Sequence, residues 1–201
     1  MKKTIRLTLA VLGFTLLGAC ATQKESLALY DLGLLRPLQG APAPSALPPL
    51  SVAEINAPAW LDSQMMFFRL AYVNDQQPRA YSSSRWSMPP AQLFNQRLKS
   101  RIGQAGGTVL PASDGAINIP LLRIEADDFT QVFDNSAHSS ARVAMRASVF
   151  QGRALVAQKT FIRQSPAPTP DASGGVRALA DASDAMITEM MSWLAGLPLK
   201  K

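Results

Sequence analysis

Alternating apolar and polar residues run through most of this chain and predict a sheet. Side chains of a strand point to its two faces in turn, so an apolar residue at every second position marks a half-buried strand. The clearest run is 140–150, where Val143, Met145, Ala147 and Val149 share one face. Alternation or a continuous apolar block predicts strands over 28–35, 50–55, 60–72, 80–86, 121–133, 140–150 and 154–163, with a short strand or turn at 108–110.

Turn-forming residues join several of these strands directly. Residues 134–138 and 151–153 are short reversals, so the last three strands are predicted to form an antiparallel meander. Residues 73–78, which end in a proline, predict a turn that pairs the two strands on either side as a hairpin. The adjacent acids Asp127 and Asp128 interrupt the alternation of their strand, which indicates a β-bulge.

Apolar residues three and four apart predict two helices. The first covers 91–102, with Phe94, Leu98 and Ile102 on one stripe, and the second runs from about 176 to 195. Each helix has a single apolar face, and so have the alternating strands. The simplest arrangement is an α+β fold: an antiparallel or mixed sheet with a C-terminal three-strand meander and two helices packed on one face.

Two proline-rich segments are predicted to be loops, because proline cannot donate to a regular ladder of hydrogen bonds. They cover 36–49 and 164–175, the second ending in Gly174 and Gly175. No internal repeat divides the remaining chain, so we expect one α+β domain over 28–201.

The N-terminus resembles a bacterial lipoprotein signal peptide. Basic residues precede an apolar run at 7–17 that is too short for a stop-transfer helix. The small residues before Cys20 resemble a lipobox, whose cysteine receives a diacylglycerol, becomes the first residue after cleavage and is N-acylated. The resemblance implies a signal peptide over 1–19, lipidation of Cys20 and a lipidated tether over 20–27. The alternative is an ordinary secretory signal. A transmembrane anchor is disfavoured because Gln23, Lys24 and Glu25 end the apolar run.

Removal of the signal peptide changes the charge of the chain. The full sequence has 201 residues and a formal charge of +6, which falls to +3 without Lys2, Lys3 and Arg6. This small excess does not favour nucleic acid as a partner. Cys20 is the only cysteine, so no disulfide can form within the chain and a packed core must stabilise the fold.

The sequence contains no convincing catalytic or metal site, so we predict no enzyme and no cofactor other than the lipid on Cys20. His138 is the only histidine and lies in a predicted turn of ordinary composition. Glu125, Asp127 and Asp128 are a candidate cation or acid–base site, but carboxylates on the solvent face of a strand are common. The exposed turn and the solvated face are the favoured interpretations.

Candidate binding residues are more numerous. The apolar block at 65–68 is either an acyl-chain or partner surface or, as we favour, a buried strand. The tryptophans are either core residues or contacts, and Trp193 favours a contact because it lies off the apolar stripe of its helix. Most basic residues are expected to be a solvated face: Arg79, Arg85, Arg97, Lys99, Arg101, Arg142 and Arg146.

Residues 57–102 resemble the ABC-type transport auxiliary lipoproteins, the PqiC-like family. The resemblance rests on the segment ending in Trp60, an apolar strand closing at Arg69, and Tyr81 four residues before Arg85 and Trp86. Prolines and a helix follow, and the lipobox, first strand, meander and last helix fit the same plan. Ser82-Ser83-Ser84 replaces the more aromatic or acidic residues usual before Arg-Trp in this family, so the subgroup to which the chain belongs stays open.

The resemblance implies a non-catalytic auxiliary subunit of an intermembrane lipid transport system. Such a lipoprotein is expected on the periplasmic face of the outer membrane, where it docks the conduit formed by an MCE-domain protein and assembles as a homo-oligomeric ring. Ala21 after the cysteine agrees with outer-membrane sorting. The expected partner contacts are Trp60, Arg69, Tyr81, Arg85, Trp86 and Trp193.

Two other functions remain open at this point. One is an envelope-assembly lipoprotein unrelated to lipid transport, which recovery of an MCE-domain partner would exclude. The other is an anchored hydrolase acting on envelope components, which would need a site around His138 or the acidic strand.

Overall fold

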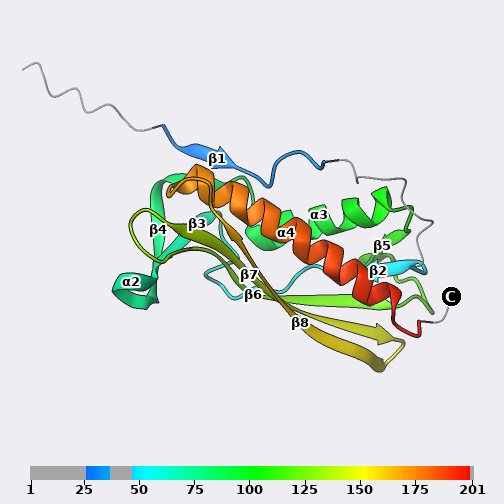
Figure 1. Cartoon of the computed structure of the whole chain (residues 1–201). Helices are drawn as coiled ribbons and strands as arrows, with labels where there is room; N and C mark the ends of the chain where they lie inside the picture. Colours follow the sequence, from blue (N-terminus) through cyan, green and yellow to red (C-terminus); the bar gives the residue numbers. More distant parts are fainter. Residues whose placement is uncertain (1–25, 37–46, 200–201) are drawn as a thin grey trace, which may run out of the picture.

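The computed structural model describes residues 26–36 and 47–199, and it contains a mixed sheet covered by helices (Figure 1). The signal peptide, Cys20 and most of the loop predicted at 36–49 lie outside the described residues. The elements are β1 (Ala28–Tyr30), β2 (Leu50–Val52), β3 (Met65–Leu70), α2 (Ala71–Asn74), β4 (Asp75–Trp86), α3 (Pro90–Gln104), β5 (Val109–Pro111), a 3₁₀ turn η1 (Ala112–Asp114), β6 (Leu121–Phe133), β7 (Ser139–Gln151), β8 (Ala154–Pro166) and α4 (Ala172–Ala195).

Strand β6 organises the eight-stranded sheet. Along one edge it pairs antiparallel with β7, which in turn pairs with β8, and this is the predicted meander. Its other edge is shared: β2 pairs in parallel with the first residues of β6, and β3 pairs in parallel with the last three. The order β1-β4-β3 extends the sheet from one half of β6, and β2-β5 extends it from the other.

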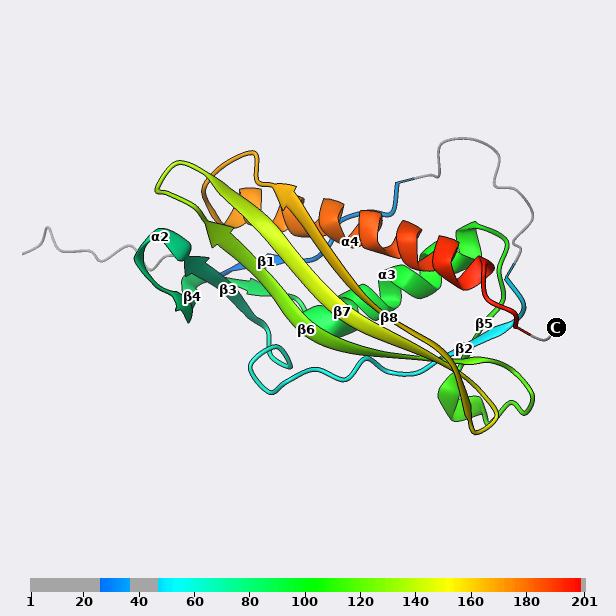
Figure 2. The same cartoon turned by 60° about the horizontal axis from the view of Figure 1, so that its bottom comes forward.

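Both long helices cover the same face of this sheet (Figure 2). Helix α4 crosses the meander, and α3 lies beside α4 on the side of β2 and β5 (Figure 1). One continuous core joins the two layers, with Phe94 and Leu98 from α3, Met186 and Met190 from α4, and Phe129 from β6 all buried. The predicted α+β fold is therefore confirmed.

The register shift between Ala126 and Asp128 confirms the bulge predicted in β6. Before it, Leu122, Ile124 and Ala126 face the core; after it, Phe129 does. One extra residue in the strand therefore keeps the apolar side chains of both halves of β6 on the helical side.

Two strands are shorter than predicted, and one predicted turn is a helix. The segment predicted as a strand over 28–35 leaves the sheet after Tyr30, because Gly33 adopts a φ of 72° and its amide N–H donates to Asp31 Oδ1 at 2.7 Å in a tight turn. Strand β2 ends at Val52 and is buried on both faces, although its alternation predicted a half-buried strand. The predicted turn at 73–78 is instead the short helix α2 followed directly by β4.

The loop predicted over 164–175 is wrong at both ends. Strand β8 continues to Pro166, which pairs with Ser140 at an edge where proline needs no donor. Helix α4 begins at Ala172, because Asp171 Oδ1 accepts a hydrogen bond at 2.7 Å from the N–H of Gly174 and caps it.

The two glycines of this first turn mark close packing and not a loop. A Cβ on Gly175 would lie 2.0 Å from Gln131 Oε1 on β6, and a Cβ on Gly174 would lie 2.0 Å from the Thr169 carbonyl oxygen. Only glycine lets α4 approach the end of β6 this closely.

We expect Gly175→Ala to lower the free energy of unfolding by about 1–3 kcal/mol, the usual cost of overpacking, because Gln131 is buried and hydrogen-bonded. Gly103→Ala is the matched control: it also lies in a helix, and its Cβ would meet nothing within 4 Å. That control should stabilise the protein by up to about 1 kcal/mol. Urea unfolding measures both, and equal effects of the two substitutions would contradict the close contact.

Candidate functional site

Within the described residues, His138 has no neighbour suited to catalysis. It lies exposed in the turn between β6 and β7, where its Nδ1 is 3.2 Å from Asn135 Oδ1. Asn135 Oδ1 also accepts from the backbone N–H groups of Ala137 and His138, so the asparagine shapes the turn. This is the exposed turn histidine that the sequence analysis favoured.

The acidic strand is occupied by salt bridges. Glu125 pairs with Arg146 at 2.6 Å and Asp128 pairs with Arg142 at 3.1 Å, both across the β6–β7 pair. Thr130 donates a further hydrogen bond to Asp128 Oδ1. No group of histidine, cysteine or acidic residues suited to a metal ion occurs within residues 26–36 and 47–199.

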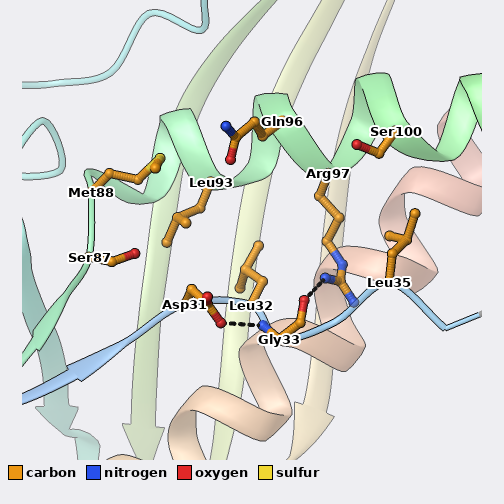
Figure 3. A pocket seen from close by; sticks show the side chains of 10 residues that line it. All are labelled: Asp31, Leu32, Gly33, Leu35, Ser87, Met88, Leu93, Gln96, Arg97 and Ser100. Atoms are coloured by element: carbon orange, nitrogen blue, oxygen red, sulfur yellow. Dashed lines mark hydrogen bonds between the residues drawn. The ribbon is translucent and has the colours of Figure 1, made fainter.

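The helical face carries a more organised arrangement, in which the segment after β1 lies across both long helices (Figure 3). Arg97 of α3 donates through Nη1 to the Gly33 carbonyl oxygen at 3.0 Å, and Arg101, one turn later, donates to the Arg36 carbonyl oxygen at 2.5 Å. These two arginines fix the segment 31–36 onto the helices.

Asp184 of α4 neutralises both guanidinium groups. Arg97 binds its carboxylate through two atoms, at 2.7 and 2.8 Å, and Arg101 approaches it at 3.1 Å. The side chains of Arg97 and Arg101 are only 7% and 10% exposed, against 25% for Asp184. Burial alone would raise the pKa of Asp184, but the hydrogen bonds and charges of the two arginines outweigh it and lower the pKa.

Two open hollows flank the segment 31–36. One, of about 340 Å³, lies between the segment and α3 and is lined by Leu32, Met88 and Gln96 among others (Figure 3). The other, of about 990 Å³, lies on the α4 side and includes Leu34 and Val176. Arg97 and Gly33 line both hollows, so the segment 31–36 and its contact with Arg97 separate one hollow from the other.

The structure brings two of the predicted contact residues together: Arg69 on β3 and Trp60 in the turn before that strand. The guanidinium of Arg69 lies 5.8 Å from the ring centre of Trp60, and Trp60 packs edge-on against Phe67 at 5.4 Å. Arg69 Nη1 also donates to the Asp75 carbonyl oxygen at 2.9 Å. Trp60, Phe67 and Arg69, here called the β3 cluster, are all partly exposed.

Tyr81 and Arg85 lie together on β4 but serve the fold. The Tyr81 hydroxyl donates to Gln131 Oε1 at 2.8 Å, and Gln131 Nε2 donates to Ser139 Oγ at 2.8 Å. Burial, with a smaller effect of the Asp171 charge, raises the pKa of Tyr81 far above its ordinary value. Arg85 Nη1 donates to the carbonyl oxygens of its own strand at Tyr81 and Ser84.

The other two predicted contacts are packed against the core. Trp86 is 1% exposed and lies edge-on to Phe129 at 5.7 Å, so in this conformation it offers no surface to a partner. Trp193 is partly buried against Phe161 at 5.5 Å, near the end of α4 and far from the β3 cluster. Trp193 lies off the apolar stripe of α4, as its spacing indicated, but its ring still packs against the sheet.

Sequence reasoning missed the joint formed by Asp184 with Arg97 and Arg101, and placed both arginines on a solvated face. That expectation is wrong for these two residues, which are buried. A signal was present, because Arg97 and Arg101 are four residues apart and border the Phe94–Leu98–Ile102 stripe. Their acidic partner lies 83 or more residues away, and no local pattern indicates it.

We expect Asp184→Asn to destabilise the protein at neutral pH by about 3 kcal/mol, because two buried guanidinium groups lose their counter-charge. The lowered pKa of Asp184 means that the carboxylate stabilises the fold above its ordinary value of 3.8, and that this contribution is lost as pH falls through the lowered pKa. The difference between wild type and variant should therefore shrink below pH 3.8.

Asp181→Asn is the control on the same helix, because Asp181 is exposed and forms no ion pair with any other described residue. Urea unfolding from neutral to acidic pH compares the three proteins. A difference between wild type and Asp184→Asn that does not change with pH would contradict the charge argument.

None of the described helices is long and apolar enough to cross a membrane. No curated protein matches the chain significantly. Among solved structures, protein XCC0632 from Xanthomonas campestris, of the family DUF330, has a TM-score of 0.71 and 20% sequence identity, and the match covers 83% of this chain and 94% of that one. An uncharacterized protein has a TM-score of 0.67 and 14% identity over 85% of this chain and 99% of that one.

At these identities the two structures show a common fold and nothing more. The sequence profile of the ABC-type transport auxiliary lipoprotein component family matches residues 30–191, which is most of the chain. That range includes β4, the meander and all but the last turn of α4. The chain therefore belongs to the ABC-type transport auxiliary lipoprotein component family, as its resemblance over residues 57–102 predicted.

Proposed function

We propose that this protein is a non-catalytic, lipid-anchored subunit that docks the conduit of an ABC/MCE-type lipid transport system at the outer membrane. The observation that carries the proposal is the family match over residues 30–191, which makes the chain an auxiliary transport lipoprotein component. Its partner is the MCE-domain protein of that system, and several copies form a ring around the conduit's end.

The chemistry of the described residues supports a role without catalysis. The candidate acids Glu125 and Asp128 are held in salt bridges with arginines, and the His138 ring lies beside Asn135 of its own turn. The best-organised polar group, Asp184 with Arg97 and Arg101, holds a backbone segment in place. These contacts make a rigid body suited to positioning a partner.

The anchor in this proposal is Cys20, carrying an S-diacylglycerol and an N-acyl chain. Each buried methylene is worth about 0.8 kcal/mol, so a triply acylated terminus is held stably in a bilayer. The partner surface is the β3 cluster, because an aromatic ring stacked with an arginine is the composition of binding hot spots. The β4 residues Tyr81, Arg85 and Trp86 support this surface through the pairing of β4 with β3. Trp193 packs against Phe161 away from it.

We expect Cys20→Ser to abolish incorporation of labelled palmitate and to release the protein from the membrane fraction, because the thiol accepts the diacylglycerol. Ala21→Asp should keep the label but shift the protein to the inner-membrane fraction, since aspartate after the cysteine favours retention there. Sucrose-gradient fractionation with palmitate labelling distinguishes the two. Labelling of the Cys20→Ser protein equal to that of wild type would contradict the anchor.

We expect in-cell crosslinking and affinity purification of the lipidated protein to recover an MCE-domain protein, identified by mass spectrometry. Arg69→Ala should reduce that recovery about tenfold, since loss of about 1.4 kcal/mol at a hot spot weakens binding tenfold. Arg123→Ala is the matched control: Arg123 is exposed and also stacks on an aromatic ring, that of Phe150 at 5.0 Å, at the other end of β6.

Equal recovery from the two arginine variants would remove the β3 cluster as the partner surface. Recovery of other envelope proteins without any MCE-domain component would overturn the transport proposal. It would favour the envelope-assembly function instead.

A further inference from the structure

The tip of the β3–β4 hairpin exposes two large apolar side chains side by side. Helix α2 forms the tip, and all four of its residues are exposed, Tyr72 by 50% and Val73 by 61%. Residues 75–78 continue the exposed stretch into β4.

The hairpin behind this tip is firmly fixed to the sheet. Phe68 packs edge-on against Phe133 of β6 at 5.8 Å, and its ring lies tilted against that of Tyr81 of β4 at 4.6 Å. Beyond them, Leu70 and Asn74 form an isolated bridge that closes α2. The two exposed apolar side chains are therefore held in place at the end of the molecule.

The pairing of β1 places its first residue, Ala28, toward the same end. Strand β1 runs parallel to β4, with Ala28 opposite Ser84. The chain before Ala28 therefore leaves β1 in the direction from which β4 comes, which is the tip, and both views place the start of β1 and α2 at one end of the molecule (Figures 1 and 2).

The length of the tether sets how far this end can be from the bilayer. Eight residue steps separate Cys20 from Ala28, and they span at most about 29 Å. Along the sequence, Gln76 in the exposed stretch is also eight residues from Ser84, the partner of Ala28. An anchored Cys20 thus reaches the membrane surface when the hairpin tip points toward it.

We propose that the hairpin tip, residues 71–78 with Tyr72 and Val73, is a second membrane contact that lies on the bilayer holding the lipid anchor. Tyrosine places its ring at the headgroup level, with an apolar body and a polar end. Arg69 and Arg79 flank the tip and outnumber the single acidic residue between them, Asp75, which suits an anionic lipid surface. The proposal rests on the lipid anchor of the proposed function.

The test uses the full lipidated protein in vesicles of phosphatidylethanolamine and phosphatidylglycerol, without any partner protein. Val73→Cys carries an environment-sensitive fluorophore, and Ile117→Cys is the matched control. Ile117 is exposed and precedes β6, whereas β3 and the tip lie at the far end of that strand, about 40 Å away. Acylated Cys20 has no free thiol to react with the dye.

We expect the probe at residue 73 to shift its emission to the blue and to lose most of its fluorescence to headgroup-depth quenching lipids, while the probe at residue 117 does neither. If the protein floats with the vesicles but the probe at residue 73 is not quenched, the tip contact alone is overturned. The exposed tip would then be a surface for a protein partner. Protein that does not float with the vesicles overturns the anchor and, with it, the tip contact. Mass spectrometry of the Cys20 peptide in the same sample reports the acylation directly.

Discussion

The fold depends on one strand that must present the same face to the helices along its whole length. Strand β6 pairs with β7 on one edge and with two separate strands, β2 and β3, on the other. Its core residues have even numbers before the bulge and odd numbers after it. Without the extra residue between Ala126 and Asp128, the second half of β6 would turn Phe129, Gln131 and Phe133 away from α4. The attachment of β3, and with it the hairpin and β1, depends on this bulge.

The helical layer imposes a second constraint at the point where the N-terminal segment crosses it. Burying Arg97 and Arg101 is favourable only because Asp184 compensates their charge and because the carbonyl oxygens of Gly33 and Arg36 accept their remaining donors. A polar joint of this kind specifies one arrangement, since each guanidinium has its partners in fixed directions. It fixes α3 to α4 and both helices to the segment that follows β1, so β1 is held by its pairing with β4 on one side and by this joint on the other.

Local patterns predicted the elements well, and the errors have a common cause. The meander, the bulge and both helices followed from periodicity, because each reflects burial of a single face. The sequence predicted a loop at Gly174 and Gly175. Their actual role is close packing, for Gly175 against Gln131, and a local pattern does not indicate a contact with a residue so distant in sequence. Trp86 and Trp193 were predicted as contacts from the resemblance and, for Trp193, from its position off the apolar stripe. Their packing against Phe129 and Phe161 depends on the folded sheet and leaves no signal in the local sequence. Pairing across 83 or more residues, as for Asp184, leaves no local trace.

A protein whose role is to hold a partner near a membrane needs a stiff connection between its anchor and its docking surface. Here the connection is short: β1, next to the tether, pairs with β4, and β4 pairs with β3, which carries Trp60's neighbours Phe67 and Arg69. Strand β3 is in turn bound to the end of β6. Because backbone hydrogen bonds link every step, a pull on the tether acts on the sheet as a whole and not on a loop. Under the proposed function, the β3–β4 hairpin therefore couples the membrane side of the molecule to its partner side within the width of three strands.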